Sequence, residues 1–146
     1  MQRLNDEEYK YVYSRSPRLC VDLAIVTPEG LLLSKRLIEP FKKSWHFPGG
    51  RVIYKESIND AISRIAKKEV GVKIKTEELL GFLEIINDGE YVHSVSLVFI
   101  VKINSGEVKG GDQAKQFKAF KKIPDNMHSS HKKFIKKYWA KILRLA

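Results

Sequence analysis

The chain has 146 residues and a formal net charge of +10, and 43% of its residues are hydrophobic. This length and composition are typical of one globular domain. No apolar run reaches membrane-spanning length, and the polar, acidic start MQRLNDEEYK does not resemble a signal peptide. The single cysteine, Cys20, cannot form an internal disulfide. These features predict a cytoplasmic protein with no membrane partner.

The positive charge favours polyanionic partners, either nucleotides or nucleic acid. Lysine outnumbers arginine, so base-specific recognition of nucleic acid is the less favoured of the two.

Helical and strand-like segments are mixed along the chain. Apolar periodicity and turn residues predict helices over 6–13, 58–69 and from Ser129 or Ser130 onward, and strands over 19–26, 31–36, 79–86, 91–103 and 116–121. No repeat or linker divides these segments, so we expect one domain over residues 1–146. The pattern alone leaves the fold class between α/β and α+β.

The expected helix over 58–69 ends in an unusual carboxylate. Ser57 and Asp60 form an N-terminal capping pattern, and Gly71 is well placed to end the helix. Glu69 then lies near the middle of the apolar stripe and at the negative end of the helix dipole. The helix alone leaves two interpretations, a metal ligand or a side chain that extends into solvent at a frayed end. The preceding glycine pair and the spacing of the segment favour the metal.

That spacing is a glycine, five residues, Glu56, seven residues, Arg64 and then Glu69-Val70-Gly71-Val72. It resembles the Nudix box, a loop–helix–loop that holds a divalent cation against a nucleoside diphosphate. The resemblance implies a Nudix-type α/β/α sandwich, class α/β, with a mixed sheet. Ile65 and Lys68 stand where the commonest box has carboxylates, and this variant is similar to the box of GDP-mannose mannosyl hydrolases.

The resemblance extends to residues before the box and implies their roles. The positions of Arg36 and Arg51 contact the diphosphate leaving group in the mannosyl hydrolases, and the position of Asp22 serves the sugar end. Planar guanidinium groups suit phosphate oxygens, although surface ion pairs are the alternative use. Asp22 lies in an apolar strand, where a structural hydrogen bond is the alternative to a functional role.

The metal set implied by the resemblance is Glu69, Gln113 and the backbone carbonyl of Gly49. Three oxygen ligands shared with substrate phosphates suit one Mg²⁺, with Mn²⁺ as a substitute. The mannosyl hydrolases place a general-base histidine directly after the glutamine, and this chain has Ala114 there.

Another residue is therefore needed to activate water. His93 lies in the strand near the family's active site and is the candidate we assign to the substrate site, with a surface or structural histidine as the alternative. The other candidate bases are Glu84, Asp88, Glu90 and Asp112. His46 could face the site from the loop before the glycine pair, whereas His128 and His131 are expected to be solvated beside the last helix.

The leading interpretation is a Mg²⁺-dependent hydrolase of a nucleoside diphosphate sugar, similar to GDP-mannose. Water would attack the sugar's anomeric carbon and release sugar and nucleoside diphosphate. The alternatives are a pyrophosphohydrolase that attacks phosphorus, and a catalytically weak nucleotide- or RNA-binding module. The resemblance in the first helix, together with Tyr9, Tyr11 and Tyr13, also predicts a homodimer.

Overall fold

The structure is a computed structural model that describes residues 3–37, 43–86, 93–108 and 116–146. Its strands are β1 (Arg18–Thr27), β2 (Gly30–Lys35), β3 (Trp45–His46), β4 (Gly49–Arg51), β5 (Val72–Ile86), β6 (His93–Gly106) and β7 (Gln116–Phe120). In the described ranges these seven strands form one sheet with the order β3-β2-β1-β6-β5. β4 pairs with β1, and β7 pairs with β2. β1 and β6 are parallel and the other pairs are antiparallel, so the sheet is mixed.

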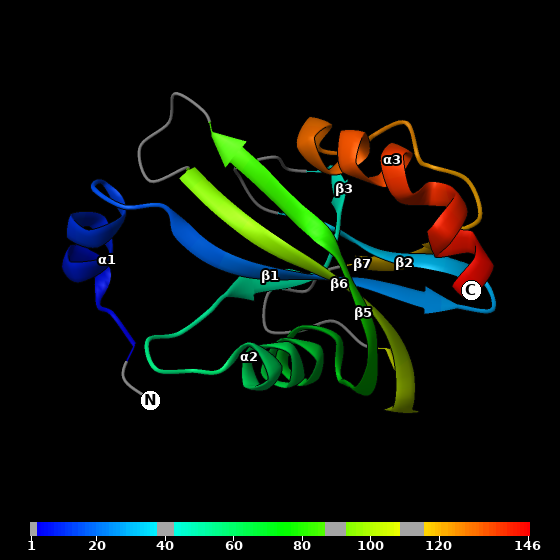
Figure 1. Cartoon of the computed structure of the whole chain (residues 1–146), viewed down its shortest axis with the longest axis horizontal. Helices are drawn as coiled ribbons and strands as arrows, with labels where there is room; N and C mark the ends of the chain where they lie inside the picture. The colour runs from blue at the N-terminus through cyan, green and yellow to red at the C-terminus, as the bar shows by residue number, and fades with distance from the viewer. Residues whose placement is uncertain (1–2, 38–42, 87–92, 109–115) are drawn as a thin grey trace.

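The helices are α1 (Asp6–Tyr13), α2 (Ile58–Ile65), the π-helical turn η1 (Ala66–Val70) and α3 (Ser129–Leu145). α2 and α3 lie on opposite faces of the sheet, while α1 lies apart from both, beyond the start of β1 (Figure 1). This arrangement confirms the predicted α/β/α sandwich. No helix in the described ranges is long and apolar enough to cross a membrane.

Each face of the sheet has its own hydrophobic core because side chains alternate along β1. The core beneath α3 contains Ala24, Val26, Leu33, Phe47, Ile100, Phe134, Ile135 and Ile142. The core beneath α2 contains Val21, Leu23, Ile25, Ala61, Ile62, Ile65, Val70 and Val101. Asp22, Cys20 and Arg18 continue the α3 side of β1 beyond its apolar part. The two cores therefore fix β1 in place and leave its N-terminal half to carry polar groups.

The strand expected over 79–86 begins earlier, at Val72. β5 is the edge strand of the sheet, and its first half exposes Lys73, Lys75 and Glu77 to solvent. Its pairing with β6 also shifts register at three places. The first half of β5 was not predicted because its exposed charged residues and its bulges interrupt the simple alternation of apolar and polar residues. The short strands β3 and β4 were not predicted either.

The helix expected over 58–69 changes type before its end. The α-helix ends at Ile65, and η1 continues the chain to Val70. The N–H of Gly71 donates to the carbonyl of Ala66 at 2.9 Å, five residues earlier, and Gly71 adopts a positive φ of 86°. The wider turn buries both Ala66 and Val70. π-turns of this kind often occur at functional sites.

Candidate active site

An ion pair between Glu56 and Arg64 fixes the loop that joins β4 to α2. Nε of Arg64 donates to Oε2 of Glu56 at 2.8 Å, and Nη2 donates both to Oε1 at 3.0 Å and to the carbonyl of Arg51 at 2.8 Å. The N–H of Ile53 donates to the same carboxylate at 3.0 Å. These contacts, Arg64 first, lower the pKa of Glu56. The Glu56 carboxylate is therefore bonded within the loop, and through Arg64 it holds the backbone of Arg51 in position.

We expect Glu56→Gln to lower the free energy of unfolding by about 3 kcal/mol, because it leaves Arg64 beside a neutral partner in a mostly buried site. Glu78→Gln is the matched control. Its ion pair with Lys141 is 2.7 Å long but about 40% exposed on both sides, so its loss should cost less than about 1 kcal/mol. Urea unfolding of both variants measures the difference, and equal losses would show that the Glu56 pair has no special structural role.

Asp22 is buried where β1 meets β4. It pairs with Gly49, and its side chain is only 9% exposed. A Cβ atom at position 49 would overlap Oδ1 of Asp22, so the first glycine of the pair is required by this carboxyl group. Burial raises the pKa of Asp22 to about 7, and the Ser96 hydroxyl opposes part of that rise. A carboxyl group of this kind can bind or exchange a proton near neutral pH.

Arg51 lies at the end of β4, opposite Cys20. Its Nη1 donates to the hydroxyl of Tyr13 at 3.2 Å, and its guanidinium carbon lies 5.5 Å from the centre of that ring. In the described part of the chain, no carboxylate forms an ion pair with Arg51. Arg51 is thus a half-buried cation with no ion-pair partner among the described residues, which suits an anionic ligand.

Arg36 follows β2 and is half-buried. Its N–H donates to the carbonyl of Ser44 at 3.1 Å, and its carbonyl accepts from the N–H of Lys43 at 2.7 Å. These bonds hold its backbone beside the start of β3. The role of Arg36 in binding a leaving group stays a prediction.

The predicted metal ligands come from both ends of the box. Glu69 is half-buried in η1, and Gly49 is half-buried in β4. Gln113 lies outside the described residues. The described residues include no group of three or more histidine, cysteine or acidic side chains that could hold a metal ion. A single carboxylate with a backbone carbonyl fits a hard cation that takes its remaining oxygens from phosphate and water.

His93 does not join this group. It pairs with Ile86 at the start of β6. Val98 of β6 lies beside Asp22, and His93 lies five residues before it, or about 16 Å along the strand. An odd number of residues also places the two side chains on opposite faces of the sheet. The structure therefore brings Asp22, Gly49 and Arg51 together and leaves His93 apart from them.

The expectation that His131 is solvated is wrong. His131 is 7% exposed, and its Nδ1 accepts the N–H of Phe47 at 3.3 Å. Its ring centre lies 6.0 Å from that of His46 and 5.4 Å from that of His128, whose Nδ1 caps α3 by accepting from the N–H of Ser130. The cap was predicted at Ser129 or Ser130. Helical spacing to Phe134 and Ile135 was the signal that His131 faces the core.

Burial, with smaller effects of His46 and His128, holds the pKa of His131 well below its usual value of 6.5. The folded protein then binds its proton less readily than the unfolded chain. Its contribution to stability is complete above about pH 7 and is lost as the pH falls below 6.5. We expect the parent to lose stability relative to His131→Gln over pH 7 to 5, by up to about 1.4 kcal/mol per pH unit. A stability difference independent of pH, measured by urea unfolding, would contradict this expectation.

The tyrosines of α1 have different environments. Tyr9 and Tyr13 pack edge to face, with ring centres 4.7 Å apart, and contact arginines of the same chain, whereas Tyr11 is 65% exposed. The ring centre of Tyr11 lies 4.2 Å from the guanidinium carbon of Arg15, so all three residues that motivated a homodimer have partners within the chain. The homodimer stays a prediction.

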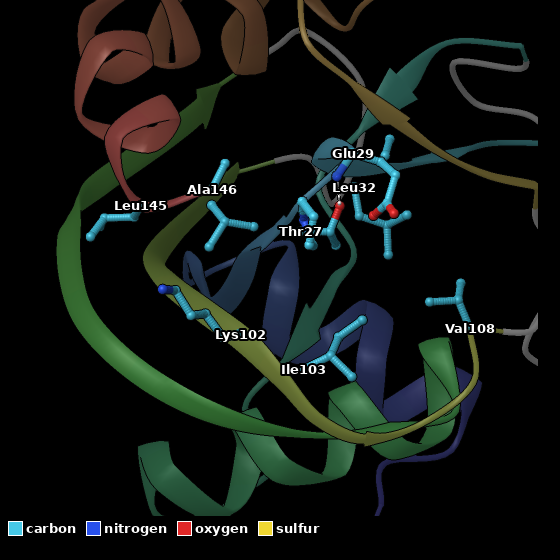
Figure 2. Close-up of a pocket in the computed structure, with 11 residues that line it drawn as sticks. Thr27, Glu29, Leu32, Lys102, Ile103, Val108, Leu145 and Ala146 are labelled. Carbon is cyan, nitrogen blue, oxygen red and sulfur yellow. Dashed lines mark hydrogen bonds between the residues drawn. The ribbon is translucent and has the colours of Figure 1, made fainter.

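A separate pocket of about 450 Å³ lies at the other end of β1 (Figure 2). Its lining contains Val26, Thr27, Pro28, Glu29, Leu32, Lys102, Ile103, Val108, Ala119, Leu145 and Ala146. Val26 is four residues from Asp22, about 13 Å along the strand. None of the predicted site residues that the structure describes lines this pocket, and most of its described side chains are apolar. It is a recess distinct from the polar group around Asp22 and Arg51.

Comparisons with known proteins identify the family and agree with the fold. Residues 16–138 match the model of the NUDIX domain. The chain is 35% identical to an ADP-ribose pyrophosphatase of Methanocaldococcus jannaschii, over 88% of this chain and 77% of that protein. It is 31% identical to the low-salt glycan biosynthesis protein Agl8 of Haloferax volcanii, over 86% and 85% of the two chains. The crystal structure of a MutT NUDIX hydrolase from Burkholderia pseudomallei superposes with a TM-score of 0.73 at 25% identity, covering 84% of this chain and 98% of that one.

Proposed function

Because the chain belongs to the Nudix family and is a Nudix hydrolase, we propose that it hydrolyses a nucleoside diphosphate sugar, similar to GDP-mannose, with Mg²⁺ as its cofactor. The observation that carries the proposal is the reduced set of carboxylates at the positions where the commonest box holds its cations. Ile65 is 1% exposed in the core, and Lys68 points to solvent. Glu56 is used by Arg64. Glu69 is the carboxylate that the resemblance to the box assigns to a cation, so the site is suited to one metal ion rather than several.

Each residue then has a separate task. Glu69, the carbonyl of Gly49 and Gln113 would hold Mg²⁺ or Mn²⁺, which when bound neutralises charge that develops on the diphosphate. Arg51 donates hydrogen bonds to the phosphate oxygens of the leaving group, and Arg36 adds a second cation there. The ion pair of Glu56 and Arg64 fixes the loop between β4 and α2 and keeps Arg51 aligned. This lowers the entropy cost of ordering the site around the substrate.

Asp22 is suited to the sugar end of the substrate. Its carboxyl group is buried beside Gly49, with a pKa near 7, so it is present both as an acceptor and as a donor at neutral pH. A sugar hydroxyl group can pair with either form. The attacking water would approach the anomeric carbon, and the bond to the diphosphate oxygen would break, which releases free sugar and nucleoside diphosphate.

A pyrophosphohydrolase is the second candidate function. The relative from Methanocaldococcus jannaschii is named an ADP-ribose pyrophosphatase, and it is 35% identical to this chain. Such an enzyme would attack phosphorus and release a sugar phosphate and a nucleoside monophosphate. Both candidates share the diphosphate, the cation and the arginines, and they differ in the bond that breaks.

A panel of nucleoside diphosphate sugars with Mg²⁺, including GDP-mannose and ADP-ribose, tests the proposal. We expect free sugar and nucleoside diphosphate as products. Sugar phosphate with nucleoside monophosphate would establish the second candidate instead. If no member of the panel is cleaved while nucleotides still bind, the weak nucleotide-binding module is the correct interpretation.

A further inference from the structure

Two arginines of the sheet are held by one side of α1. Nη1 of Arg18 donates to the hydroxyl of Tyr9 at 2.6 Å, and Nη1 of Arg51 donates to the hydroxyl of Tyr13 at 3.2 Å. The guanidinium carbon of Arg51 also lies 5.9 Å from the ring centre of Tyr9. Tyr9 and Tyr13 are four residues apart and therefore neighbours on the helix surface. Both guanidinium groups thus lie against the same aromatic pair.

Neither arginine is neutralised by a carboxylate among the residues that the structure describes. Arg64, in contrast, has a complete ion pair with Glu56. Arg18 and Arg51 are both half-buried, and Nε of Arg18 is buried without a hydrogen-bond partner in the described residues. Two partly desolvated cations close together repel each other unless an anion lies between them. Their tyrosine partners supply orientation and no negative charge.

The position of the two arginines connects them to the candidate active site. Every second side chain of a strand faces the same side, so Arg18, Cys20 and Asp22 share one side of β1. Cys20 pairs with Arg51 of β4. Burial raises the pKa of the Cys20 thiol to about 11, with a further rise from Asp22 and opposing effects of Arg18 and Arg51. The thiol is therefore neutral, and it lies within the electrostatic reach of all three charged groups. Among the described residues, no carboxylate, Asp22 included, forms an ion pair with either arginine.

We propose that Arg18 is a further phosphate-binding residue beside Arg36 and Arg51, and that Arg18 and Arg51 together form a two-arginine site for the diphosphate of the substrate. Arg51, next to the glycine pair, binds the phosphate nearer the cation, and Arg18 binds the other phosphate. Tyr9 and Tyr13 are positioning residues that hold the two planar groups. The assignment rests on the proposed function for the identity of the ligand, since a diphosphate offers two linked anions to two guanidinium groups that lie against the same aromatic pair.

Inorganic pyrophosphate is the probe, titrated calorimetrically in the presence of EDTA so that Glu69 and the cation make no contribution. We expect Arg18→Gln to bind pyrophosphate about 10- to 100-fold more weakly than the parent, the usual effect of losing hydrogen bonds to a charged group. Arg18→Lys should recover part of that loss, because it keeps the charge without the planar fork. Arg144→Gln, which removes an exposed arginine from α3, is the control and should bind like the parent. Thermal melts verify that each variant folds.

Tyr9→Phe separates phosphate binding from simple support of α1. It removes the hydroxyl contact with Arg18 and keeps both arginines, so it should weaken binding by less than about 10-fold. Equal losses in Tyr9→Phe and Arg18→Gln would mean that Arg18 only anchors the helix and would overturn the proposal. Unchanged affinity in Arg18→Gln would also overturn it.

The proposed function can fail separately from this assignment. If the parent binds pyrophosphate through Arg18 but cleaves no nucleoside diphosphate sugar, the two-arginine site stands and the assigned reaction is wrong. If the parent cleaves the sugar substrate while Arg18→Gln matches its pyrophosphate affinity, the reaction stands and the role of Arg18 is wrong.

Discussion

Replacing Glu69 by glutamine is expected to lower metal-dependent hydrolysis by at least about 10²-fold, because a bound cation supplies several kcal/mol of stabilisation to charge that develops on the diphosphate. Glu69 is the half-buried carboxylate near the C-terminal end of the box helix, in η1. Glutamine keeps the size and one oxygen of the side chain but removes its charge. Mg²⁺ titration of activity measures the loss, and electron paramagnetic resonance of Mn²⁺ measures binding directly.

Glu77→Gln is the matched control for this variant. Glu77 is an exposed carboxylate on the edge strand β5. Removing it changes the net charge by the same amount, so a general electrostatic effect would appear in both variants. Both proteins should melt within a few degrees of the parent. If Glu69→Gln binds Mn²⁺ like the parent, the metal site has been assigned to the wrong residue.

Introducing a histidine at Ala114 is expected to raise hydrolysis at the anomeric carbon by up to about 10²–10⁴-fold, the usual effect of a positioned base. The expectation comes from the sequence resemblance, since Ala114 lies outside the described residues. The added rate should depend on a group with a pKa near 6.5. Affinity for GDP should change little, because Arg36 and Arg51 are retained.

Ala114→Gln provides a control of similar bulk without a comparable base. An equal gain in the histidine and glutamine variants would point to packing rather than proton transfer. No gain in either, together with rapid cleavage of another diphosphate by the parent, would show that the parent's reaction does not need a base at this position. The pyrophosphohydrolase would then replace the leading function.

Capping residues and apolar periodicity predicted the helices and strands whose burial and pairing stay the same along their length. The helix over 6–13 is confirmed, and Asn5 and Glu8 form a capping box at its start. The strands that begin near Leu19 and Leu31 are confirmed as well. Where the environment changes within an element, the sequence pattern was insufficient. η1 depends on how Ala66 and Val70 pack against the sheet, and the first half of β5 is paired on one edge only.

Parts of the site could be predicted because they lie close together in the sequence. The spacing of Glu56 and Arg64 identified the box, and the structure shows that this pair closes the loop between β4 and α2. The contact of Asp22 with Gly49 needed the register of β1 against β4, which no local pattern contains. The same holds for Arg18, whose partner Tyr9 belongs to a helix that the sequence does not orient.

The position at which water attacks the substrate tests the central claim most directly. Hydrolysis of a cleaved nucleoside diphosphate sugar in H₂¹⁸O, followed by mass spectrometry of both products, locates the oxygen that came from water. The account predicts ¹⁸O in the free sugar and none in the nucleoside diphosphate. Label in a phosphate group, with sugar phosphate and nucleoside monophosphate as products, would contradict it.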